Sequence, residues 1–229
     1  MKTLGIIGIV IVALVGLWMW KYPSGTWRYK MTLTVQTPEG VKTGSAVREV
    51  HVATGPELPQ ATAVVRVKGE AIVVDMGRGG LLFGLLRSQT SVDGASYVFF
   101  DNFPIPGSRG SGDSSTTSEG VRYYNQLKSG KAEIAARDLP MLVRFKDIND
   151  PQTVERVDPN NLAVTYGEGV KLTSATIEIT DEPITTGIEK RLGWLSSHRK
   201  GYLDGQFAGG GPELSNVLYA GDFQKGTNQ

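Results

Sequence analysis

Residues 4–20 read LGIIGIVIVALVGLWMW, a run of seventeen residues that contains no charged side chain. A helix that crosses a bilayer needs about 17 to 25 mainly apolar residues, so this run meets the lower limit. Its apolar residues would occupy every side of a helix, which favours lipid over a half-wet protein surface. The sequence therefore predicts a transmembrane helix at 4–20, with indole rings at one end where they suit the membrane interface. The expected anchor residues are Leu4, Ile7, Ile11, Leu14, Leu17, Trp18 and Trp20.

Three interpretations of this run compete. A cleaved signal peptide needs a small-x-small site after the apolar run, whereas residues 17–20 are Leu-Trp-Met-Trp. A core helix would carry polar residues on a solvent-facing side, and the run carries none. An uncleaved signal-anchor fits the residues best. The glycines of the run lack Gly-xxx-Gly spacing, so no helix dimer is expected from that motif.

The charges beside the run and the form of the run favour opposite orientations. Lys2 precedes the run, whereas Lys21, Arg28 and Lys30 follow it. The positive-inside rule, taken alone, would place the following domain in the cytoplasm. A Met-Lys start, an immediate apolar run and then a large domain are instead typical of Sec-directed envelope proteins. We expect a single-pass protein of the bacterial inner membrane whose soluble domain is periplasmic.

Composition excludes several classes of function. The 229 residues carry 24 basic and 23 acidic side chains, so the formal net charge is +1. This balance gives no electrostatic footprint for nucleic acid. The chain has no cysteine, which excludes disulfides, thiolate metal sites and thiol nucleophiles.

The rest of the chain predicts one α+β domain built mainly on antiparallel sheet. We expect a linker at 21–26, the domain at 27–220 and a frayed tail at 221–229. A loop at 104–118, rich in Gly and Ser, is the place where the domain would divide if it divides. Apolar and polar residues alternate from Trp27 to Val35, which is the period of a half-buried strand.

Further segments predict the remaining elements. Thr37–Gly40 carries turn residues and should join two strands, and Lys68-Gly69 should form a second hairpin. The aromatic run 96–103 is expected to be another strand. Additional strands are expected at 45–53, 141–148 and 171–181, with a strand or helical turn at 81–86. Three short helices are expected near 119–130, 158–167 and 187–194.

The search for chemistry gives few candidates. The two histidines, His51 and His198, lie among polar neighbours, and neither has the local spacing of a zinc site. A Ser-His-Asp arrangement stays open because its members converge only in space, although no Gly-x-Ser-x-Gly elbow occurs. Asp101 and Asn102 interrupt an aromatic run and are hard to explain as core. Together with His198 they are the candidates for a polar site.

Two loops fall short of binding motifs. Asp147–Asp150 resembles the opening of a calcium loop, but Gly is missing at position six and Glu at position twelve. Gly77–Gly80 follows a strand without the glycine spacing of the dinucleotide fingerprint, so a hairpin turn is expected there. We therefore expect no cofactor and no metal.

Three blocks of the sequence resemble a known group of proteins. They are TPEGVKTGS at 37–45, VRFKDINDP at 143–151 and IEKRL at 188–192. All three are similar to sequence in a group of uncharacterised proteobacterial membrane-anchored proteins that begin with an apolar segment. The resemblance spans most of the domain and implies a bacterial source. It brings no activity, cofactor or catalytic residue.

These observations favour a membrane-tethered envelope domain that binds another protein and is not an enzyme. Its partners would be the lipid bilayer, through 4–20, and a second protein, with no nucleic acid. One form of this hypothesis is an immunity-type protein that neutralises a toxin at the membrane. The alternatives are an envelope hydrolase that uses His198 or His51 with Asp101, and a phage-derived or assembly protein.

Overall fold

The computed structural model describes residues 2–58, 61–108, 115–198, 201–207, 209 and 211–226. Side chains are described for these residues except 2–5, 57, 58, 61 and 62, so the side chain of the expected anchor residue Leu4 lies outside the described set. The fold is α+β, and every described strand pairing is antiparallel, which confirms the predicted class. Among the described residues, no helix combines the length and the apolar character that crossing a bilayer requires.

The elements have the following bounds. The α-helices are α1 (Lys2–Lys21), α2 (Gly94–Asn102), α4 (Ser118–Gln126) and α5 (Ala163–Tyr166). The strands are β1 (Ser24–Thr37), β2 (Gly40–Leu58), β3 (Ala61–Glu70), β4 (Ile72–Asp75), β5 (Leu81–Ser88), β6 (Lys131–Glu133), β7 (Pro140–Phe145), β8 (Val154–Val157), β9 (Lys171–Ile179) and β10 (Gln224–Lys225). Short 3-10 helices are η1 (Gly77–Gly79), η2 (Ala136–Asp138), η3 (Pro151–Thr153), η4 (Ile188–Lys190), η5 (Leu214–Asn216) and η6 (Ala220–Asp222).

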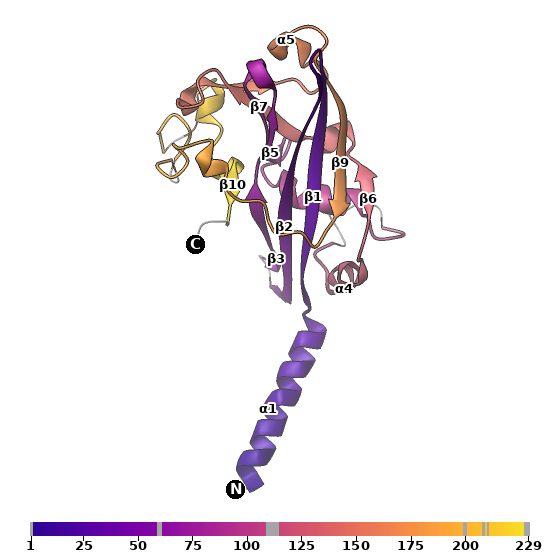
Figure 1. Ribbon diagram of the computed structural model, residues 1–229. Coiled ribbons are helices and arrows are strands. Elements are labelled where there is room, and N and C mark those ends of the chain that lie inside the picture. The colour runs from indigo at the N-terminus through magenta and orange to yellow at the C-terminus, as the bar shows by residue number, and fades with distance from the viewer. Residues whose placement is uncertain are drawn as a thin grey trace.

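The described strands form two sheets (Figure 1). The larger sheet has the order β10-β3-β2-β1-β9-β6, and the smaller has the order β4-β5-β7-β8. β1 and β2 pair along the whole of β1. The predicted turn joins them at Pro38 and Glu39, and Gly40 follows with a φ of +119°. A residue with a Cβ rarely adopts that backbone angle, which explains the glycine.

The main core lies between the two sheets and under α2 and α4. The predicted alternation of β1 is confirmed, because Trp27 and Leu33 are buried whereas Thr34 is half exposed. Rings from three elements meet in this core. Trp27 of β1, Phe99 of α2 and Tyr124 of α4 have centroids 5.4 Å to 6.0 Å apart. These contacts hold both helices against β1, since aromatic pairs bury much apolar area and prefer such tilted or offset geometry.

A buried guanidinium ties the two sheets together. Arg48 of β2 is 1% exposed. Its Nε donates to the carbonyl of Glu70 at 3.1 Å, and its Nη2 donates to the carbonyls of Gly84 and Leu85 at 3.0 Å and 3.2 Å. Burial lowers the pKa of Arg48, and the neighbouring Tyr29 hydroxyl offsets part of that effect. A buried polar group is costly without hydrogen bonds, and here the backbones of β3 and β5 supply them.

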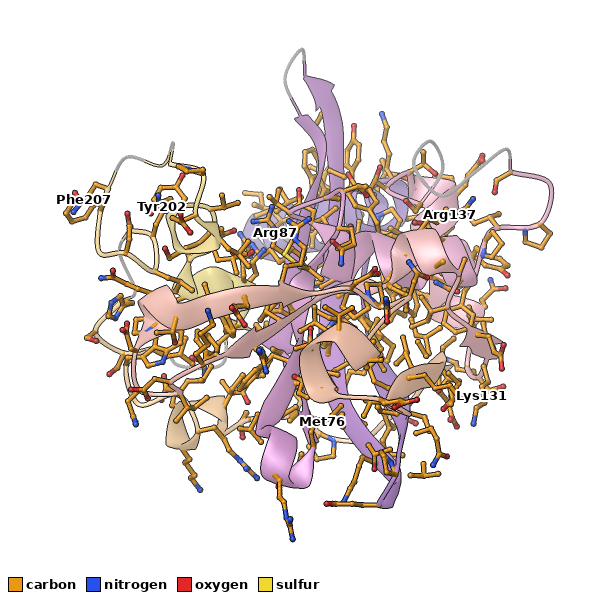
Figure 2. The ribbon with its side chains drawn as sticks, turned by 90° about the horizontal axis from the view of Figure 1, so that it is seen from above. Met76, Arg87, Lys131, Arg137, Tyr202 and Phe207 are labelled. Carbon is orange, nitrogen blue, oxygen red and sulfur yellow. The ribbon has the colours of Figure 1, made fainter. Side chains whose placement is uncertain are left out.

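The C-terminal strap, which we define as the described residues between 187 and 226, covers the second face of the smaller sheet. Phe83 of that sheet meets Phe223 of the strap with ring centroids 6.2 Å apart. In the view from above, Tyr202 of the strap lies on one flank of the body and Lys131 of β6 on the opposite flank (Figure 2). The smaller sheet is therefore buried on both faces, which explains the unbroken apolar run at 81–86.

One buried carboxylate holds both ends of the strap. Glu70 is 1% exposed. Its two oxygens accept hydrogen bonds from the backbone N–H groups of Gly187, at 2.9 Å, and Ile188, at 2.8 Å. The side-chain amide of Gln224 donates to the same carboxylate at 3.0 Å. Hydrogen bonds to an ionised acceptor are stronger than those to a neutral one. Glu70 therefore fixes the start and the end of the strap to the end of β3.

The prediction that 96–103 is a strand is wrong, because residues 94–102 form α2. Ala95, Val98 and Phe99 are spaced three and four residues apart, which places them on one buried side of a helix. The strand preference of aromatic and β-branched residues depends on context, and packing against β1 overrides it here.

The predicted hairpin at Lys68-Gly69 is also wrong. β3 continues to Glu70 in the larger sheet, and β4 begins at Ile72 in the smaller one. Gly69 has a φ of +142°, and a Cβ there would lie 2.9 Å from Cγ of Arg48. The chain thus crosses from one sheet to the other beside the guanidinium that links them. The hairpin predicted at Gly77–Gly80 is confirmed between β4 and β5.

The linker and the three expected helices have bounds that differ from the prediction. The linker expected at 21–26 shortens to two residues, because α1 ends at Lys21 and β1 begins at Ser24. The helix expected near 119–130 is α4, and the one at 158–167 is reduced to α5. At 187–194 only η4 is helical, and the N–H groups of Gly187 and Ile188 donate to the Glu70 carboxylate where that segment enters the strap.

The tail and the loop complete the comparison. The tail expected to fray from 221 is ordered up to Gly226, because Phe223 is fully buried and β10 pairs with β3. Residues 227–229 lie outside the described residues, as do 109–114 of the loop expected at 104–118.

Candidate functional site

The end of α1 is fastened to the body by side chains of α4. Ser118 donates to the carbonyl of Lys21 at 3.0 Å, and Asn125 donates to the carbonyl of Ser24 at 3.1 Å. Arg122 donates to the carbonyl of Trp20. The last carbonyls of a helix have no partner within it, and α4 supplies donors to two of them, at Trp20 and Lys21. The helix therefore enters β1 through a braced junction.

Aromatic and basic side chains gather at this junction. The guanidinium of Arg122 lies over the ring of Trp20, 5.5 Å from its centroid. The ammonium of Lys21 lies 5.4 Å from the ring centroid of Tyr22, and that ring lies 4.7 Å from the ring of Trp18. Such a mixture of aromatic and cationic groups is typical of a membrane interface.

The predicted anchor residues are all exposed where their side chains are described. The exposed fraction of the large apolar side chains of α1 ranges from 51% to 72%. The anchor residues in this set are Ile7, Ile11, Leu14, Leu17, Trp18 and Trp20. α1 thus stands away from the body (Figure 1), and its exposed apolar side chains lie on all sides of the helix.

A cavity of about 500 Å³, which we call the edge groove, lies along the outer edge of β3. Residues 65–68 of β3 form one wall, and Ser96, Tyr97 and Phe100 of α2 form the other. Ser115 and Thr116, which precede α4, also line the cavity. Lys225 and Gly226 close one end, where β10 stops. The α2 residues are spaced one, three and four apart, so a single side of that helix faces the groove.

The charges of the edge groove are mainly positive. Arg66, Lys68 and Lys225 line it, whereas Asp93 is the single carboxylate among its described lining residues. A narrow region with an excess of one sign raises the local concentration of oppositely charged groups. The groove is therefore suited to an anionic ligand.

A second cavity, of about 410 Å³, lies where α4 meets β1 and the end of β9. Arg28 and Glu49 line it and form an ion pair at 2.9 Å, so its charges are balanced. Trp27 and Tyr124 also line it, and their buried Nε1 and hydroxyl groups have no hydrogen-bond partner among the described residues. This cavity lies beside the junction and has no excess charge to select a ligand.

Asp101 and Asn102, two of the candidates for a polar site, lie at the end of α2 and line neither of these cavities. The amide of Asn102 donates to the carbonyl of Val98 at 2.8 Å, which is a local contact within the helix. The sequence correctly directed attention to this segment, because α2 forms a wall of the edge groove. The residues that face the groove are nevertheless its hydroxyl and aromatic ones.

Asp101 acts instead on its neighbours through its charge. Burial raises the pKa of Asp138, the Asp101 charge raises it further, and Arg137 opposes both effects. Burial also raises the pKa of the Tyr124 hydroxyl, and the Asp101 charge adds to this effect. Like charges close together disfavour ionisation, which accounts for the direction in which Asp101 shifts both pKa values.

The histidines bind hydroxyl and carbonyl groups. Nδ1 of His198 lies 3.1 Å from both the Ser197 hydroxyl and the Trp194 carbonyl. Nδ1 of His51 lies 2.9 Å from the Thr26 hydroxyl. The described hydrogen bonds of both imidazoles therefore do not include the carboxylate that a catalytic triad would supply.

The described residues contain no group of three or more His, Cys, Asp or Glu placed to hold a metal ion. In the calcium-like segment, Asp147 accepts from the N–H of Asn149 and Asp150 accepts from the N–H of Gln152, both at 2.9 Å. These are turns in which a side chain caps its own loop.

Sequence reasoning missed the edge groove. Its walls come from β3, α2 and the end of the strap, which are far apart in the chain. The local signal was the alternation of Val65 and Val67 with Arg66 and Lys68. That pattern predicts a strand, but only the pairing of the sheet makes it an edge.

No protein-family model, no curated protein and no solved structure matches this chain. The resemblance to proteobacterial proteins stays a prediction.

Proposed function

We propose that this chain is a single-pass, membrane-tethered bacterial envelope protein that acts by binding another protein and not by catalysis. The observation that carries the proposal is the surface of α1, whose large apolar side chains are 51% to 72% exposed. A continuous apolar surface of this kind is unfavourable in water and marks an interaction site. Lipid chains around residues 4–20 would cover it on every side.

The junction supports a body held close to the bilayer. Arg122 and Ser118 of α4 bind the last carbonyls of α1, so the helix and the body would move together. The aromatic rings at the same level, together with the Lys21 ammonium and the Arg122 guanidinium, match the headgroup region. α4 lies at the end of the body from which α1 leaves (Figure 1). A partner bound to the body would therefore be held near the membrane surface.

Protein binding is supported by the edge groove and by the described contacts of the histidines. The groove follows a strand edge, which is a common place for another chain to pair. The imidazoles of His51 and His198 bind hydroxyl and carbonyl groups in the described contacts, so they lack an orienting carboxylate there.

Membrane attachment is tested with the full chain and a variant that carries Ile11→Lys and Leu14→Lys. Each lysine placed at the centre of a membrane helix costs about 2.5–3.5 kcal/mol, so the variant should leave membranes in alkaline carbonate whereas the natural chain should need detergent. Release of both chains without detergent would contradict the tether. A reporter enzyme active only in the periplasm, fused after Gln229, tests the side of the membrane.

Protein binding is tested by placing a photo-crosslinking residue at Tyr97, in the edge groove, or at Lys190, an exposed residue of the strap. We expect a protein adduct from Tyr97 that Lys190 does not give. Equal adducts from both positions, or none from Tyr97, would contradict a partner bound at the groove.

A further inference from the structure

β3 is paired unequally along its two edges. On one edge β2 pairs with it from Lys68 back to Ala63 and again at Ala61. On the other edge β10 pairs only with Glu70 and Gly69. Within the described chain, the backbone from Lys68 to Ala63 thus has no partner strand on this edge, and residues 65–68 of it line the edge groove. Unpaired N–H and C=O groups on an edge are a template for another strand.

The groove lies in line with β10. In that strand, Gln224 is opposite Glu70 and Lys225 is opposite Gly69, so the next position would lie opposite Lys68. Gly226 occupies that position with a φ of +65°, and a Cβ on it would lie 2.9 Å from Cγ of Lys68. A segment placed in the groove would therefore continue the sheet from the point at which β10 ends.

The register of β2 and β3 sets the direction of each side chain in the wall. Val65 lies opposite the buried Val52, and residues opposite each other in an antiparallel pair share a face of the sheet. Val65 therefore points to the inner face, toward Tyr97 of α2. Both are partly uncovered, at 39% and 45% exposed. The inner side of the groove offers apolar contact.

The alternate positions of β3 have the opposite character. Arg66 lies opposite His51, and Lys68 lies opposite Glu49, on the outer face of the sheet. Glu49 is already paired with Arg28 at 2.9 Å, which leaves an excess of positive charge beside this edge. A neighbouring strand would place every second side chain beside Arg66 and Lys68. Opposite charges in that position stabilise strand pairing, and like charges prevent it.

We propose that the edge groove binds an extended segment of a partner protein in which acidic and apolar residues alternate, and that the segment adds to β3 as a new edge strand. Its carboxylates would lie beside Arg66 and Lys68 on the outer face. Its apolar side chains would lie over Tyr97 and Phe100 on the inner face. The proposal rests on the proposed function, because it names the kind of protein segment that the groove accepts. Main-chain hydrogen bonds would supply affinity, and the alternating contacts would supply selectivity.

The test uses the full chain in non-ionic detergent and fluorescent peptides of about ten residues, long enough for a strand. One peptide alternates Glu and Val, one alternates Lys and Val, and one alternates Glu and Pro. Proline has no N–H to donate to a sheet, so the Glu-Pro peptide keeps the charge but cannot pair. Fluorescence anisotropy should report binding of the Glu-Val peptide alone.

Charge reversal distinguishes binding at the edge groove from non-specific electrostatic attraction of the peptide to the protein. Arg66→Glu with Lys68→Glu should weaken the Glu-Val peptide by about tenfold and admit the Lys-Val peptide, because two attractive cross-strand pairs become repulsive. Lys131→Glu is the matched control, since β6 is the opposite edge of the same sheet. It should change neither result. Hydrogen exchange at the amides of residues 63–68 should slow when the Glu-Val peptide binds.

Three results would overturn strand addition: equal binding of the Glu-Pro peptide, an equal effect of Lys131→Glu, or no binding of the Glu-Val peptide. The first would mean that the site selects anions by charge alone. These results are independent of the carbonate extraction above. If the chain stays in membranes but does not bind the Glu-Val peptide, membrane attachment is supported and strand addition at the edge groove is contradicted.

Discussion

Replacing Glu70 by glutamine is expected to loosen the C-terminal strap. In the natural chain both carboxylate oxygens accept backbone N–H groups, at Gly187 and Ile188, and one also accepts the amide of Gln224. A glutamine keeps one acceptor oxygen and turns an NH₂ group toward a site that contains donors. At least one buried N–H group of the strap then loses its acceptor.

The size of the effect follows from these contacts. A hydrogen bond to a charged group is worth about 1.5–3 kcal/mol, and a buried donor left without an acceptor costs about 1–3 kcal/mol. Since Glu70 is 1% exposed, water does not replace the lost partner. We expect the free energy of unfolding to fall by about 3 kcal/mol. For a chain of this size, that corresponds to a Tm lower by roughly 6–12 °C.

The assay is urea unfolding followed by far-UV circular dichroism, combined with hydrogen exchange at the amides of Gly187 and Ile188. Those two amides should exchange faster in Glu70→Gln, because they lose their carboxylate. Glu182→Gln is the control, since that carboxylate is exposed and pairs with Lys30 at the surface. It should change stability by no more than about 0.5 kcal/mol. If both variants behave alike, the strap is not held by Glu70.

Three further outcomes are expected. Burial raises the folded-state pKa of Asp222 above its ordinary value of 3.8, so folding favours its protonated form, and its stabilising contribution is lost as pH rises through that raised pKa. The free energy of unfolding of the natural chain minus that of Asp222→Asn should therefore decrease as pH rises above about pH 4. Urea unfolding measures both values, and a difference that does not change with pH would refute the prediction. Arg122→Ala removes a cation–π contact and a hydrogen bond that together contribute roughly 1.4 kcal/mol, so trypsin should cleave after Lys21 about tenfold faster. Lys128→Ala is the control and should leave the rate of that cleavage unchanged. Mass spectrometry of the fragments over time measures both rates. Burial raises the pKa of the Tyr124 hydroxyl, so this group should not ionise below about pH 11. The phenolate absorbance of Tyr124→Phe, followed as the pH is raised, should therefore match that of the natural chain up to that pH. Loss of a phenolate step in the variant below that pH would contradict this.

Much of the fold was predictable because it depends on local periodicity. The alternation from Trp27 to Val35 requires one buried face, and it is confirmed in β1. The turn residues at Thr37–Gly40 place the first hairpin. The segment 96–103 was predicted wrongly, because its aromatic residues suit either a strand or a buried helix, and only the neighbouring rings of β1 and α4 decide between them.

The candidate site depended on tertiary structure to a greater degree. The sequence by itself determined the uncharged run at 4–20, the antiparallel class and the alternation of β3, since each is a pattern within one short segment. Only the folded chain decided that β3 lies at an edge, that α2 turns Tyr97 toward it, and that Glu70 closes the strap over the smaller sheet. These are contacts between segments far apart in the chain. Their free energy comes from packing and pairing that no single segment contains.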